Sequence, residues 1–314
     1  MSDIEREQYT VKNPVIFIVY NRPELTKLVF GEIKKVRPKT LFVIADGPKY
    51  VEQSELCQLT RDIINEIDWE CEVYKNFSPI NIGCRTRVSS GLSWAFEKTE
   101  AAIIIEDDIF PDPTFFRFCD EMLERYRDDE RIMMISGTNV LQVSNGDNSY
   151  FFSRYPAIWG WATWRRAWKR YDVNLEDWPT RRKKKDHFKI FKNDNEAKVR
   201  ATLWNEIYYD KFDTWDYQWD YCRFFNQGIG INPKYNLISN LGFGDHATHT
   251  KDCTNPMSNI PRKSLDFPMK HPEIVEVDEA YDDLYLQKFI YRPSWKIPLS
   301  VLKKKIFKTL RLSL

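Results

Sequence analysis

The sequence has no long hydrophobic run. Its longest apolar stretches, residues 15–20 and 101–105, are much shorter than the roughly 20 residues that a membrane-spanning helix needs. Residues 1–12 are polar and charged, so we expect no secretory signal peptide. An excess of either charge is also lacking, because 47 Lys and Arg face 46 Asp and Glu, for a net charge of +1. This balance disfavours a protein that coats nucleic acid, and we expect no nucleic-acid partner.

Cysteines are few and scattered. The six of them form no C-x-x-C pair and show no zinc-ligand spacing, which favours buried thiols in a reducing compartment. We therefore expect a cytoplasmic protein. The 42% hydrophobic and 15% aromatic content is far from the composition of disordered chains, so most of the length should fold, into one or two domains.

Apolar strands alternate with helical stretches along the first half of the chain. We expect strands at residues 15–20, 40–45, 71–74, 101–105 and 132–136, and helices at residues 24–36, 51–67, 83–99 and 113–126. This alternation predicts an α/β fold with a mostly parallel sheet flanked by helices. Ligands of such sheets bind at the carboxyl ends of the strands.

Polar side chains follow three of these strands. They are Asn21 and Arg22 after the first, Asp46 after the second, and Glu106, Asp107 and Asp108 after the fourth. Three successive carboxylates repel one another and lose hydration beside an apolar strand, so a cation should stabilise them. Mg²⁺ or Mn²⁺ accepts one or two such carboxylates together with phosphate oxygens. Alternatively, Asp107 or Asp108 caps the helix that begins near Pro113.

Two arginines precede the fourth strand. Arg85 and Arg87 lie at the start of the helix that leads into it. Guanidinium forks suit the oxygens of a diphosphate, so both are candidates for donor binding. Ordinary solvated helix residues are the alternative.

Tryptophans dominate residues 151–168. Gly160 between Trp159 and Trp161 indicates close approach of the backbone to a flat or bulky group, such as a sugar stacked on the indoles. We include Trp215 in this candidate acceptor pocket. Packing in the core without a ligand is the competing interpretation.

Two aspartates begin a later helix, within residues 214–228. Asp216 lies near its start and Asp220 one turn later on the same face. Either carboxylate is a candidate general base, and Asp216 is the preferred one. A simple interaction with the helix dipole is the alternative.

Three further segments remain. A loop at residues 240–250 carries Gly244, His246 and His249, which could contact phosphate or metal or simply be exposed. Residues 170–201 are highly charged, and we expect a solvated excursion there rather than a nucleic-acid patch. Residues 296–314 form a basic amphipathic pattern that predicts a helix docked on anionic lipid, with packing against the domain as the alternative.

Taken together, residues 14–250 resemble the GT-A class of nucleotide-sugar glycosyltransferases. The sequence is most similar to the N-acetylglucosaminyltransferase I type, through the E-D-D variant of the D-x-D motif at residues 104–108, followed by residues 113–116. The Trp215-Asp216 pair and the loop at residues 242–250 are similar to its catalytic-base and phosphate-covering regions. Arg85 and Arg87 are instead similar to the broader family 2 pattern.

This resemblance implies a catalytic domain at residues 1–250, with a nucleotide-binding half at 13–136 and an acceptor-side half at 137–250. Residues 251–314 would form a C-terminal extension with an amphipathic helix. The implied roles are Asp46 at the base, Asp107 at the ribose, Asp108 at Mn²⁺ or Mg²⁺, Arg22 beside the nucleotide, and Asp216, or alternatively Asp220, as the base catalyst.

The function so implied is an inverting, metal-dependent transfer of a sugar from a nucleoside-diphosphate donor to a hydroxyl of a glycan or glycolipid. UDP is the favoured nucleotide of this donor. The basic tail would hold the protein at the inner face of the membrane. Two alternatives are a sugar-nucleotide nucleotidyltransferase and a non-catalytic sugar-binding protein. The first is expected to carry a glycine-rich basic loop after the first strand, and residues 21–23 offer none.

Overall fold

The computed structural model describes residues 9–242 and 259–291. Eight strands form one central sheet in the order β3-β2-β1-β4-β8-β6-β9-β7. The strands are β1 (Val15–Val19), β2 (Thr40–Ala45), β3 (Glu72–Phe77), β4 (Ala101–Glu106), β6 (Ile132–Ser136), β7 (Tyr150–Ser153), β8 (Trp161–Trp164) and β9 (Ile229–Pro233). Only β8 and β7 run against the others. This mostly parallel sheet confirms the predicted fold class.

A second, two-stranded sheet lies next to the carboxyl end of β4. It pairs β5 (Ile109–Pro111) with β10 (Ile238–Asn240) in antiparallel fashion. Because β5 follows β4 almost directly, this pairing brings the chain after residue 240 beside the end of β4. Neither of these short strands was expected from the sequence pattern.

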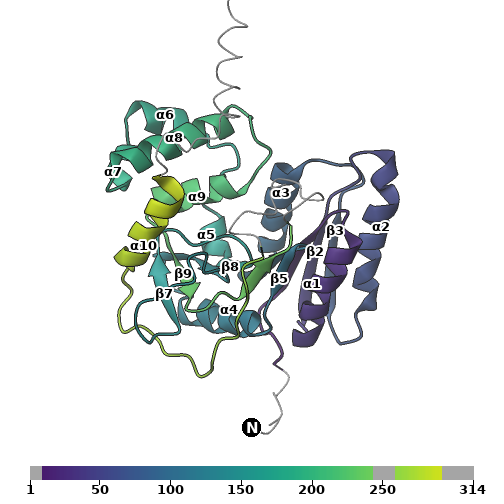
Figure 1. The fold of residues 1–314 in the computed structure, drawn as a ribbon. Coiled ribbons are helices and arrows are strands. Elements are labelled where there is room, and N and C mark those ends of the chain that lie inside the picture. Colours follow the sequence, from purple (N-terminus) through teal and green to yellow (C-terminus); the bar gives the residue numbers. More distant parts are fainter. Residues whose placement is uncertain (1–8, 243–258, 292–314) are drawn as a thin grey trace, which may run out of the picture.

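Helices cover both faces of the central sheet (Figure 1). They are α1 (Pro23–Val36), α2 (Ser54–Asp62), α3 (Cys84–Phe96), α4 (Thr114–Arg125), α5 (Arg165–Trp168), α6 (Trp178–Lys183), α7 (His187–Ile190), α8 (Asp194–Tyr208), α9 (Asp216–Phe225) and α10 (Glu279–Tyr285). Alternate residues of β1 explain the two layers, since Phe17 packs with α1 and α4 while Ile16 packs with α3 and α9. A strand buried on both faces must be apolar throughout, as β1 is.

The charged residues 170–201, expected to form a solvated excursion, belong instead to a helical lobe that extends to residue 209. Helices α6, α7 and α8 surround an apolar cluster of their own, which includes Trp178, Phe191 and Trp204. Figure 1 shows these helices together beyond α9. The charged residues therefore cover a core whose aromatic members are widely spaced in the sequence.

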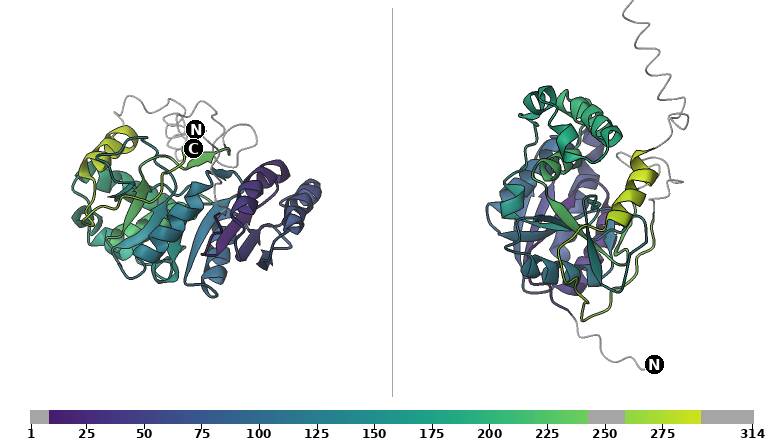
Figure 2. Two further views of the ribbon diagram at one scale, coloured as in Figure 1. Left: turned by 90° about the horizontal axis from the view of Figure 1, so that it is seen from below. Right: turned by 90° about the vertical axis from the view of Figure 1, so that its left-hand side faces the viewer.

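The described part of the C-terminal segment packs on the rest of the chain. Leu265 and Met269 join the main core, and α10 lies against β7 (Figure 2). There Asp282 accepts hydrogen bonds from Ser153 Oγ at 2.5 Å and from the Arg154 backbone N–H at 3.1 Å. The domain boundary at residue 250 stays a prediction, and the expected amphipathic helix at 296–314 lies outside the described residues.

Two further expectations concern membranes and thiols. Among the described residues, none of the helices combines the length and the apolar character that crossing a bilayer requires. The cysteines of the described ranges are free thiols, and Cys57, Cys119 and Cys222 are buried, as expected.

Candidate active site

The carboxyl ends of β1 and β4 bring one arginine and three carboxylates together. These strands pair in parallel, with Ile18 opposite Glu106, so the residues that follow each strand lie side by side. Arg22 donates hydrogen bonds to both acids that follow β4, to Asp107 Oδ1 and, at 2.9 Å, to Asp108 Oδ2. We call Arg22, Glu106, Asp107 and Asp108 the acidic cluster. The strand-end rule thus placed these residues correctly.

Negative charge exceeds positive charge in the acidic cluster, where a single guanidinium faces three carboxyl groups. Burial, with the charges of Asp108 and Asp107, raises the pKa of Glu106 to about 8. Burial likewise raises the pKa of Asp107 to about 6, although Arg22 opposes this shift. A further cation would favour the ionised form of both acids.

Asp108 is closely surrounded by Arg22 and by the chain at residues 241 and 242. Asp108 Oδ2 faces Gly242, where an added Cβ would lie only 2.0 Å away. The Leu241 backbone N–H donates to the Asp108 carbonyl at 2.8 Å. Within the described ranges, no group of three Asp, Glu, His or Cys side chains could hold a metal alone. An ion bound at Asp108 would therefore need phosphate oxygens and water as further ligands, as Mg²⁺ commonly has.

Asp46 organises the loop that precedes α3. Its carboxylate accepts hydrogen bonds from the backbone N–H groups of Gly47, Ile82 and Gly83 at 2.9–3.1 Å and from Asn81 Nδ2 at 3.0 Å. A Cβ on Gly47 would lie 2.4 Å from the Ile80 backbone, so only glycine allows this approach. Both carboxylate oxygens of Asp46 thus already accept hydrogen bonds from protein donors. The expected contact between Asp46 and a nucleobase stays a prediction. Asn21, half-buried after β1, keeps its expected role as a prediction too.

The contacts of Arg85 and Arg87 differ from those expected of residues that bind a diphosphate. Arg85 pairs with Asp210 and donates to the Val173 carbonyl at 2.8 Å, which attaches it to the helical lobe. Arg87 is buried and donates to Asn76 Oδ1 at 3.0 Å. Asn76 belongs to β3, three strands away from β4. Both guanidiniums thus bind protein groups away from the acidic cluster, because the first turn of α3 faces the lobe and β3.

Two of the predicted sugar-binding tryptophans are core residues. Trp161 and Trp215 are 1% and 3% exposed and stack on each other with ring centroids 5.7 Å apart. The close approach at Gly160, whose φ is +59°, is to the side chain of Ile238. These observations correct the expectation that Trp161, Trp215 and Gly160 contact a sugar. Trp159 is half-buried and stays a candidate.

Asp216 and Asp220 have different partners. Asp220 accepts from Arg223 Nη2 at 2.6 Å and lies 3.8 Å from Arg200 Nη1, so two arginines hold its charge. Asp216, the first residue of α9, accepts from the Thr214 hydroxyl. Burial raises the pKa of Asp216, and the nearby Asp220 charge raises it further.

Asp216 lies within electrostatic reach of the acidic cluster. Its charge contributes to the raised pKa values of Glu106 and of the Cys84 thiol. Asp216 is therefore near enough to Glu106 for their charges to interact, and its role as the base catalyst stays a prediction. Tyr217, which directly follows Asp216, is 39% exposed. Gly244, His246 and His249 lie outside the described residues.

Several solved structures are similar to this chain at low identity, whereas no protein-family model and no curated protein matches the sequence. One is a UDP-glucose pyrophosphorylase complexed with UDP-glucose, with 7% identity, a TM-score of 0.31 and coverage of 50% of this chain and 78% of that chain. A second is GalNAc-T7 with UDP, GalNAc and Mn²⁺, with 11% identity, a TM-score of 0.37 and coverage of 55% and 38%. A third is mouse xyloside xylosyltransferase 1 in its apo form, with 9% identity, a TM-score of 0.33 and coverage of 69% and 81%.

The chain thus spans well under half of the GalNAc-T7 chain. All three TM-scores are below 0.5, so these likenesses do not decide what this chain does. The similarity to N-acetylglucosaminyltransferase I stays a prediction.

Proposed function

We propose that this protein is a GT-A-type glycosyltransferase that moves a sugar from a nucleoside-diphosphate donor, UDP being the expected nucleotide, to a hydroxyl of a glycan or glycolipid. One observation carries the proposal. The acidic cluster lies at the carboxyl ends of β1 and β4, where α/β sheets bind ligands, and the charge of Asp216 acts on Glu106 of this cluster. A donor and a base would thus share one edge of the sheet.

The donor half of the proposed site consists of the acidic cluster. Asp108 would hold Mn²⁺ or Mg²⁺, Asp107 would accept from the ribose, and Arg22 would lie beside the diphosphate. When bound, the ion supplies positive charge that stabilises the leaving diphosphate. Arg22 already connects both aspartates, so it holds them in place and adds a second positive charge for the phosphate oxygens.

The acceptor half of the proposed site depends on Asp216. A hydroxyl of the acceptor attacks the anomeric carbon from the face opposite the diphosphate, so the new glycosidic bond forms as the old one breaks. The hydroxyl proton moves to the Asp216 carboxylate, and the configuration inverts. A raised pKa brings a carboxylate closer to the operating pH, which makes it a better general base. Asp220 is less suited, because Arg200 and Arg223 hold its charge.

A panel of nucleotide sugars tests the proposed function. The protein is incubated with Mn²⁺, each donor and a mixture of mono- and oligosaccharide acceptors, and the products are separated by chromatography. Release of nucleoside diphosphate that depends on acceptor supports the transferase. Exchange of pyrophosphate with nucleoside triphosphate would instead indicate a nucleotidyltransferase. Donor binding without any turnover would indicate a binding protein.

Attachment to an anionic membrane would bring a glycolipid acceptor to the site, and we propose residues 296–314 for this role. The full chain should then sediment with phosphatidylglycerol vesicles and stay in solution with phosphatidylcholine vesicles. Equal behaviour with both vesicles would contradict attachment through these basic residues.

A further inference from the structure

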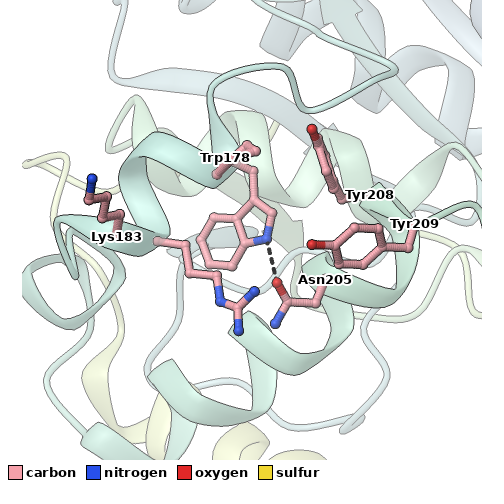
Figure 3. Close-up of a pocket in the computed structure, with 7 residues that line it drawn as sticks. Trp178, Lys183, Asn205, Tyr208 and Tyr209 are labelled. Carbon is pink, nitrogen blue, oxygen red and sulfur yellow. Dashed lines mark hydrogen bonds between the residues drawn. The ribbon is translucent and has the colours of Figure 1, made fainter.

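A second candidate binding site lies in the helical lobe, apart from the acidic cluster. Helices α6 and α8 enclose a cavity of about 300 Å³, a volume at the lower end of typical ligand pockets. Its main lining residues are Trp178, Arg182, Lys183, Asn205, Tyr208 and Tyr209 (Figure 3). Trp178, which is 1% exposed, forms the floor. We call this cavity the lobe pocket.

The polar lining of the lobe pocket consists mainly of hydrogen-bond donors. None of its lining residues, all in the described part of the chain, is acidic. The Trp178 indole N–H donates to Asn205 Oδ1 at 3.0 Å (Figure 3), which leaves the Asn205 amide NH₂ to donate to a ligand. Arg182 adds a guanidinium, and Lys183, also in α6, adds an ammonium group.

In their ion pairs, the two cations of the lobe pocket resemble Lys184 and Lys185 and differ from Arg181 and Lys189. Arg181 pairs with Asp177, and Lys189 pairs with Asp186 at 2.8 Å. Arg182 and Lys183 form no ion pair with any residue of the described ranges. Their charges are therefore available to a ligand, and an anion is the natural complement.

The remaining lining is aromatic. The Tyr208 and Tyr209 rings are edge to face with centroids 5.2 Å apart, and Tyr209 is 62% exposed. Such faces cover the apolar side of a sugar ring, while their hydroxyl groups add polar contacts. We propose that the lobe pocket binds an anionic saccharide, a sugar ring that carries a phosphate or carboxylate group.

A larger hollow adjoins the lobe pocket at Tyr208. A cavity of about 670 Å³ shares Tyr208 with the lobe pocket and is also lined by Arg85, Thr86 and Ser89 of α3. Arg85 directly follows Cys84, whose thiol lies within the electrostatic reach of Glu106 and Asp216. An acceptor of several sugars whose far end occupies the lobe pocket would run along this hollow toward α3. This part of the inference, that the anionic saccharide is the far end of the acceptor, rests on the proposed function.

Binding can be tested without any donor. The ¹⁵N-labelled full chain is titrated with glucose 6-phosphate, glucuronate and neutral glucose, while the indole N–H signal of Trp178, assigned with Asn205→Ala, reports on the pocket. We expect both anionic sugars to shift this signal and to bind about tenfold or more tightly than glucose, the scale of one charged hydrogen bond.

A matched pair of variants tests where the charge acts. Arg182→Gln with Lys183→Gln should weaken binding of glucose 6-phosphate about tenfold. Lys184→Gln with Lys185→Gln removes the same charge from residues that do not line the pocket, and it should leave affinity within about twofold. Equal losses in both double variants would overturn the proposal, as would equal binding of glucose, or displacement of the sugar by a single-stranded RNA.

The two proposals fail in different ways. Anionic sugars that shift the Trp178 signal, in a protein that releases no nucleoside diphosphate from any donor, would remove the transferase and keep the lobe pocket. Transfer to acceptors together with an unshifted Trp178 signal would remove the lobe pocket and keep the transferase.

Discussion

Replacing Gly242 by alanine should damage donor binding without unfolding the protein. An added Cβ would lie 2.0 Å from Asp108 Oδ2, whereas ordinary contact begins near 3.4 Å, so one of the two must retreat by about 1.4 Å. The backbone of residue 242 is held by its own N–H, which donates to Asn240 Oδ1 at 2.8 Å. The Asp108 carboxylate therefore moves, and its contact with Arg22 is lost or rearranged. Misplacement of a reacting group by about 1 Å can cost about 100-fold in rate.

Calorimetric titration of nucleoside diphosphate in the presence of Mn²⁺ measures this effect. We expect Gly242→Ala to weaken binding about tenfold to 100-fold and to change the melting temperature little, because the carboxylate is only partly buried. Gly31→Ala is the control, since a Cβ there meets nothing within 4 Å in helix α1. Unchanged nucleotide affinity in Gly242→Ala would refute the reasoning that Asp108 holds the donor.

Two other changes test the electrostatics of the strand ends. Asp46→Ala should reduce the free energy of unfolding by about 2–5 kcal/mol, since buried N–H groups of Ile82 and Gly83 lose their acceptor. Denaturant unfolding measures this loss, with exposed Asp62→Ala as the control. Equal losses of stability in the two variants would contradict the prediction. Glu106 holds its proton in the folded protein up to about pH 8, whereas the unfolded chain releases it near pH 4.5, so ionisation costs stability as pH rises between these values. Relative to the wild type, Glu106→Gln should therefore gain stability as pH rises from 5 to 8, and the gain should stay constant above pH 8. Thermal melts measure this gain, and a gain independent of pH would exclude the explanation.

Much of the fold was predictable because it depends on local hydrophobic pattern. Strands β1, β2 and β4 are buried on both faces, so their apolar runs stand out in the sequence. The parallel order of such strands then brings their carboxyl ends together. Arg22, Asp107 and Asp108 could be placed at one site for this reason, without knowledge of any side-chain contact.

Long-range pairing limits what the sequence reveals about the remaining candidates. Arg85 meets Asp210, a residue 125 positions away, and nothing near Arg85 indicates that partner. An indole that stacks on a sugar and one that fills a core have the same local pattern. Trp161 is buried because β8 pairs with β4 and Trp215 covers its ring, and neither contact is visible from the neighbouring residues.

The central claim is that Asp108 binds the donor and that Asp216 acts as the base catalyst. One set of titrations tests this claim most directly. The nucleoside diphosphate identified by the donor panel is titrated with Mn²⁺ into the wild-type protein, Asp108→Asn and Asp216→Asn, and turnover is measured on the same samples. We predict that Asp108→Asn loses about tenfold or more in nucleotide affinity, while Asp216→Asn binds like the wild type and loses about 100-fold or more in turnover. Normal nucleotide affinity in Asp108→Asn, or a large loss of affinity in Asp216→Asn, would contradict the claim.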